Sequence, residues 1–167
     1  MKSATLILSI ALLGQTAIAQ VAHAAIDMTP YFQPMLTGCM LPDTDAAIPE
    51  KYHDVIVGVV GENYSDGESL LMLTTYSLDG ATVFGYPLEK FEYAEESGWA
   101  NLKLYFMDSK FMALRPQFQL PVNQDNAAKF SVNANNSLGY KVTGSGVTTL
   151  EFNKEENSIG CTLATAE

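Results

Sequence analysis

The chain has 167 residues, of which 47% are hydrophobic and 17% charged, and its formal net charge is −10 at pH 7. This length suits one ordinary domain. The acidic balance argues against nucleic acid and anionic membrane surfaces as partners, because both attract basic patches. It is compatible with a basic protein partner, with a cation, or simply with a solvated surface that keeps the protein soluble.

The first 24 residues have the three-part layout of a secretory signal peptide. Lys2 precedes an apolar stretch at 4–13, and small residues follow up to Ala22-His23-Ala24. The apolar stretch is too short to span a membrane, which takes about twenty residues. We expect cleavage after Ala24, with a competing site after Ala19, and a buried N-terminal helix is the alternative. Export to the periplasm or the extracellular space follows, with a single β-rich domain at 25–167.

A short helix is predicted directly after this leader. Thr29 is placed to cap it, Pro30 occupies its first position, and Gly38 ends it. Residues 41–53 then form a loop rich in proline and acidic residues.

The remainder of the chain is patterned as strands. Apolar runs at 54–60 and 69–78 predict two strands joined through GENYSDGE, with a turn at 65–67. Asp79-Gly80 is the sharpest hairpin signal, and it predicts that residues 73–78 turn back into 81–86.

Further along, alternating hydrophobicity predicts half-buried antiparallel strands. Their inward positions are Leu102, Leu104 and Phe106; Phe130, Val132 and Ala134; Leu138, Tyr140 and Val142; Thr148, Leu150 and Phe152; and Ile159, Cys161 and Leu163. The predicted fold is mainly β: an antiparallel β-sandwich or barrel with a short N-terminal helix after the signal peptide.

The two cysteines, Cys39 and Cys161, lie near opposite ends of the chain. In an exported protein such a pair predicts one disulfide bond, which would tether the N-terminal segment to the last strand. Two buried free thiols are one alternative. Lipidation is another, since Leu36-Thr37-Gly38-Cys39 matches a lipobox, although Asp27, Pro30 and Pro34 interrupt the segment before it.

Catalytic and metal-binding residues give only weak signals. His53 is the single histidine after the leader, and no GxSxG motif accompanies it. Two acidic groups are candidates for calcium: Asp43, Asp45 and Glu50, and Glu62, Asp66 and Glu68, of which the second fails the helix-loop-helix pattern. Glu95-Glu96 and Glu155-Glu156 are pairs of carboxylates that are adjacent in sequence on turns. The two side chains of such a pair seldom point at the same substrate. We therefore expect no enzyme activity, no cofactor and no metal.

Aromatic residues crowd the middle third of the chain, and most must belong to the core. If the strands close into a barrel, Phe84, Tyr86, Phe91, Tyr93 and Trp99 are weak candidates for lining a ligand pocket. The preferred function is a non-catalytic exported domain that binds a protein partner through strand edges or acidic loops. A small-ligand carrier and a hydrolase using His53 are the alternatives.

Overall fold

A computed structural model describes residues 24–43, 47–65, 70–122 and 130–165 of the chain. Apart from Ala24, the predicted signal peptide with its alternative cleavage site lies outside these residues. So do the calcium candidates Asp45, Asp66 and Glu68, and part of the predicted turn at 65–67.

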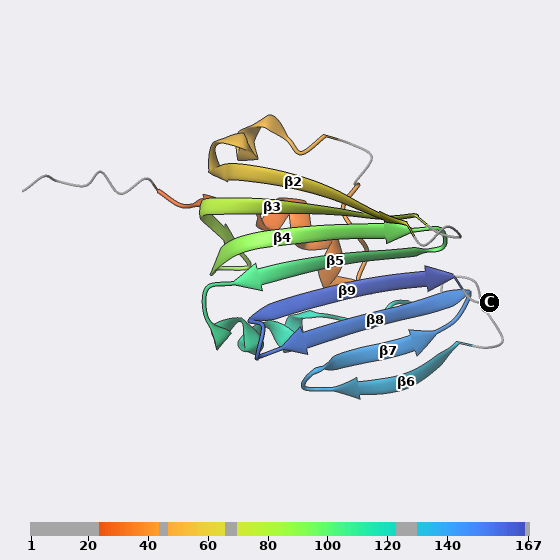
Figure 1. Ribbon diagram of the computed structural model, residues 1–167. Coiled ribbons are helices and arrows are strands. Elements are labelled where there is room, and N and C mark those ends of the chain that lie inside the picture. The colour runs from red at the N-terminus through yellow and green to blue at the C-terminus, as the bar shows by residue number, and fades with distance from the viewer. Residues whose placement is uncertain (1–23, 44–46, 66–69, 123–129, 166–167) are drawn as a thin grey trace, which may run out of the picture.

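The described residues form one open sheet (Figure 1). Its strands are β1 (Ile26–Asp27), β2 (Ile56–Ser65), β3 (Leu70–Val83), β4 (Tyr86–Glu96), β5 (Trp99–Phe106), β6 (Ser131–Asn136), β7 (Gly139–Thr143), β8 (Gly146–Asn153) and β9 (Ser158–Thr165). The order is β1-β3-β4-β5-β9-β8-β7-β6, and β2 pairs with β3 on the same side as β1. Every pairing is antiparallel except that of β1 with β3. The prediction of a mainly β fold is confirmed, and the sheet does not close.

One face of the sheet, here called the core face, is covered by helical segments (Figure 1). These are α1 (Thr29–Phe32), η1 (Gln33–Leu36) and η3 (Ser109–Gln117), while η2 (Glu50–Val55) leads into β2. The predicted N-terminal helix is confirmed, but Thr29 does not cap it, because its Oγ1 instead accepts a hydrogen bond from Phe84 N–H at 2.6 Å. The segment η3 was not predicted, since it contains Pro116 and has no helical periodicity.

The core lies between the helical segments and the sheet. Leu102, Leu104 and Phe106 of β5 are at most 2% exposed, which confirms the alternation in that strand. The covering segments contribute Met28, Phe32, Met35, Phe111 and Leu114, all at most 1% exposed. Stacking of Phe106 on Phe111, with ring centroids 4.9 Å apart, joins η3 to β5.

The hairpin predicted at Asp79-Gly80 is wrong, because β3 continues past these residues to Val83. Gly80, with φ of 70°, lies in the irregular stretch between Ser77 and Ala81 where the register to β4 shifts. A glycine with positive φ occurs in β-bulges as well as in turns. The turn instead falls at Phe84 and Gly85, with φ of 53° and 81°, the pair of positive values that a tight two-residue hairpin needs.

Two other strands differ from their predictions. The first strand begins at Ile56 rather than Asp54 and continues through Gly61 to Ser65, residues that were predicted as a loop. Strand β6 was predicted to be half-buried, yet all its residues are exposed and Phe130 precedes it. The reason is position: β6 is the last strand of the sheet, and η3 contacts it at its end, where Arg115 donates hydrogen bonds to Asn136 and Asn135.

The predicted disulfide between Cys39 and Cys161 is confirmed, with their Cα atoms 5.4 Å apart. It excludes both alternatives, free thiols and lipidation of Cys39. The bond fixes the N-terminal segment over β9, where both residues are fully buried. Backbone hydrogen bonds extend this attachment, since Gly38 N–H donates to Gln119 and Gln119 N–H donates to Leu36. An intramolecular disulfide is compatible with an oxidising compartment.

Candidate functional site

The long edge strand β2 is the most unusual surface of the described structure. It pairs with β3 on one side only. Its large apolar side chains are exposed: Val57 by 64%, Val59 by 57% and Val60 by 55%. Glu62 is the one charged residue of this strand. A long apolar strand edge is a template for pairing with another chain, because its backbone N–H and C=O groups lack strand partners.

The opposite edge has the features that normally prevent such pairing. Strand β6 has six residues with the sequence SVNANN, and its register to β7 shifts between Val132 and Ala134. Shortness, polarity and a bulge are the usual protections of an edge strand. The contrast marks β2 as the edge that is available for a partner.

A hollow of about 430 Å³ lies on the core face beside β2. We call it the aromatic hollow; it is lined by Tyr31, Pro42, Ala47, Ile48, Met72, Thr74, Tyr76, Phe91, Tyr93, Glu95 and Leu102. Tyr76 stacks on Phe91 with centroids 4.5 Å apart, and Tyr93 Oη donates to Glu95 Oε2 at 2.7 Å. Burial raises the pKa of the Tyr31 phenol, and the neighbouring Tyr76 and Asp43 raise it further. The hollow therefore combines aromatic rings with negative charge.

The five aromatic residues singled out from the sequence do not converge. Phe91 and Tyr93 line the aromatic hollow. Phe84 and Tyr86 lie at the hairpin between β3 and β4, where Phe84 packs edge-on against Phe118. Trp99 begins β5 at the other end of the sheet, beside an open hollow of about 670 Å³ that also includes Met72 and Glu95. A barrel mouth lined by all five would need a closed sheet, and this sheet is open.

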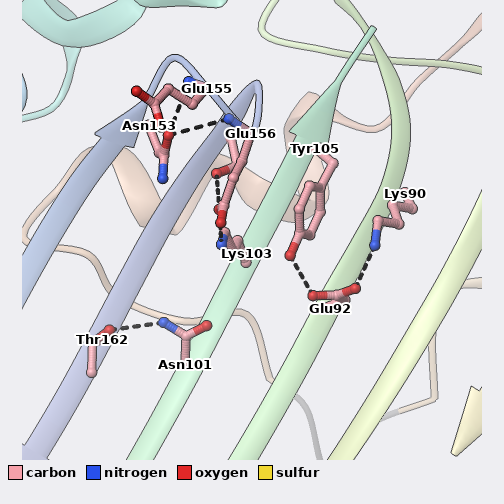
Figure 2. A network of polar contacts seen from close by, with 10 residues as sticks. Lys90, Glu92, Asn101, Lys103, Tyr105, Asn153, Glu155, Glu156 and Thr162 are labelled. Atoms are coloured by element: carbon pink, nitrogen blue, oxygen red, sulfur yellow. Dashed lines mark hydrogen bonds and ion pairs between the residues drawn. The ribbon is translucent and has the colours of Figure 1, made fainter.

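The outer face, opposite the core face, carries a network of paired polar groups (Figure 2). Glu92 accepts hydrogen bonds from Tyr105 Oη at 2.5 Å and from Lys90 Nζ at 2.6 Å. The Lys90 ammonium also lies 4.0 Å from the centre of the Tyr105 ring, and Lys103 pairs with Glu156. Burial and the hydrogen bond to Glu92 raise the pKa of Tyr105. Because these groups are paired with one another, we assign no ligand to this face.

The structure does not assemble the weak catalytic and metal candidates into a site. His53 is exposed in η2, and its Nε2 lies 2.9 Å from the carbonyl oxygen of Ile48. Glu95 and Glu96 are adjacent in β4 and so face opposite sides of the sheet. Among the described residues, no three His, Cys, Asp or Glu side chains lie close enough together to hold a metal ion.

Sequence reasoning missed the edge position of β2. The run IVGVVG has valines on both faces, a pattern that usually indicates a strand buried on both sides. The absence of lysine and proline gave no sign of an edge, since those are the residues that mark one.

Comparison with known proteins gives no match: no family model, no curated protein and no solved structure is significantly similar to this chain. Within the described residues, no helix has the length and apolar character required to cross a membrane.

Proposed function

We propose that this protein is an exported, non-catalytic binding protein that takes up an extended segment of a protein partner as an additional strand beside β2. The observation that carries the proposal is the unpaired edge of this ten-residue strand, with three exposed valines. Strand addition gains affinity from main-chain hydrogen bonds and specificity from side chains on alternate positions. Export rests on the N-terminal pattern of the sequence, and the disulfide is compatible with it.

The charge of the protein favours a basic partner. The whole chain has a net charge of −10. Glu50, Asp54 and Glu62 are exposed on β2 or on η2 just before it, and they outnumber the one exposed lysine of these two segments, Lys51. A second copy of this chain would bring the same negative charge to the interface, whereas a basic segment is attracted to it. We therefore assign the edge to a basic segment of a different protein.

The proposal is tested by selecting a phage-displayed library of random twelve-residue peptides on the mature, oxidised protein. We expect enriched peptides with strand-like alternation, and hydrogen exchange should show that the bound peptide protects 56–65 but not 131–136. Val60→Lys should weaken peptide binding at least about tenfold, because it adds positive charge and removes an apolar contact at the edge. Val132→Lys, the same change on the other edge, should leave binding within about twofold.

Two results would refute this function. One is a selection in which no enriched peptide protects β2. The other is dimerisation of the protein through β2 at micromolar concentration, measured by analytical ultracentrifugation and abolished by Val60→Lys, since the edge would then serve a second copy of the chain.

A small-ligand carrier is the second candidate, and the observation that favours it is the aromatic hollow. Native mass spectrometry of the protein purified from its expression host would reveal a retained ligand. A hydrolase using His53 gains no support from the geometry, because the ring lies against a backbone carbonyl at an exposed position.

A further inference from the structure

The core-facing side of β2 has a gap at its centre. Residues directly opposite one another in an antiparallel pair lie on the same face of the sheet. Val59 pairs with Tyr76, Gly61 with Thr74 and Asn63 with Met72, and all three β3 residues line the aromatic hollow. Val59, Gly61 and Asn63 are themselves exposed, so no other described segment covers this side of β2. The row of side chains beside the hollow is interrupted at Gly61.

The space above Gly61 is open. A Cβ atom built at this position meets no atom within 4 Å, and the backbone there is not in a conformation that requires glycine. The glycine is therefore not explained by packing or by backbone geometry within the described residues. Its effect is to leave a passage across β2 from the edge to the hollow.

A side chain from an added strand has to be long to use this passage. Neighbouring strands lie about 4.8 Å apart, so the added strand would lie roughly 10 Å from β3. A lysine side chain extends roughly 6 Å through five bonds of about 1.5 Å, and an arginine extends slightly further. Either one would cross β2 above Gly61 and leave its cationic end about 3 to 4 Å short of β3, at the rim of the hollow beside Thr74.

The hollow offers suitable chemistry for such a group. Tyr76 supplies an aromatic ring, which is stacked on the buried ring of Phe91, and Glu95 supplies a carboxylate from β4, opposite Met72. Aromatic faces and carboxylates both attract ammonium and guanidinium groups, while the apolar stem of the same side chain packs on the hydrophobic lining. Glu95 already accepts a hydrogen bond from Tyr93, which holds the carboxylate in place.

We propose that the partner strand carries a lysine or arginine that passes over Gly61 and places its cationic end at the rim of the aromatic hollow, where the negative charge of Glu95 attracts it from across β3. This inference rests on the proposed function, because it specifies the segment that pairs with β2. It gives the partner a defined chemistry, namely an extended basic segment with one basic residue at a fixed core-facing position.

The test uses the same random peptide library and four variants of the mature protein. Gly61→Val closes the passage, whereas Gly58→Val adds the same side chain on the opposite face, where the built Cβ makes only an ordinary contact with Ser77. Glu95→Gln removes the charge but keeps an acceptor for Tyr93, and Glu96→Gln removes a charge from the other face of β4. Thermal unfolding of each variant checks that it folds.

We expect peptides selected on the unmodified protein to share a lysine or arginine at one aligned position. Gly61→Val should weaken the binding of these peptides at least about tenfold and abolish the basic preference in a new selection, and Gly58→Val should change binding less than about twofold. Glu95→Gln should weaken binding about fivefold, with a reduced dependence on salt, and Glu96→Gln should not.

The outcomes separate this inference from the proposed function. Peptides that protect β2 without a shared basic residue, or that bind the Gly61→Val and Gly58→Val variants equally well, would overturn the inference and leave the function standing. If no peptide protects β2, both are overturned. Should Gly61→Val fail to fold, equal binding to the Glu95→Gln and Glu96→Gln variants would still overturn the inference.

Discussion

Breaking the Cys39–Cys161 bond should remove a large part of the stability of this protein. The bond joins residues 122 positions apart. In the chain-entropy model, closing a loop of that length costs the unfolded chain about 16 cal/mol/K, which amounts to about 5 kcal/mol at 25 °C. Domains of this size are typically stable by only 5–15 kcal/mol in total. The reduced protein should therefore keep between about 0 and 10 kcal/mol of its stability.

The assay is urea unfolding followed by tryptophan fluorescence, with and without a reducing agent. A loss of about 5 kcal/mol and a slope of roughly 2 kcal/mol/M place the reduced midpoint about 2.5 M lower. The variant in which Cys39 and Cys161 are both alanine is the control, since the reducing agent should not shift its midpoint. A loss below about 1 kcal/mol on reduction would refute the reasoning, as would two free thiols in the denatured, unreduced protein.

Two further predictions concern single residues in β7. Burial raises the pKa of Tyr140 from 10.0 to about 12, so the folded state keeps a proton that the unfolded state loses. Stability should therefore fall as the pH rises from 10 to 12. In urea unfolding, Tyr140→Phe should reduce this alkaline loss of stability. It should not lower the free energy of unfolding at pH 7, because the buried hydroxyl has no hydrogen-bond partner among the described residues. A decrease of more than about 2 kcal/mol at pH 7 would contradict this. Gly139→Ala should lower the free energy of unfolding by more than about 2 kcal/mol, since φ is 140° and the added Cβ would lie 1.8 Å from the carbonyl oxygen of Leu150. Gly61→Ala is the matched control, and equal unfolding free energies for the two variants would show that the contact at Gly139 is relieved by a small shift.

The sequence alone predicted the elements whose signals are local. The inward positions of β5 were predicted because side chains alternate between the two faces of a strand. When one face is buried, hydrophobic residues therefore recur at every second position of the sequence. The short helix at Thr29 was found from Pro30 and Gly38, which act within one or two turns of backbone. The disulfide was predicted by counting, since two cysteines allow one intramolecular pairing.

The tertiary structure decided everything that depends on which strand lies where. The positive φ that Gly80 permits serves either a turn or a bulge, and pairing of β3 with β4 made it a bulge and moved the turn to Phe84-Gly85. The valines of β2 are exposed because this strand is at an edge of the sheet, although their pattern is that of a buried strand. The aromatic hollow unites residues from α1, β3, β4 and β5 with the segment before η2. Strand order and sheet closure arise from contacts between distant segments, so they cannot be predicted from periodicity along the chain.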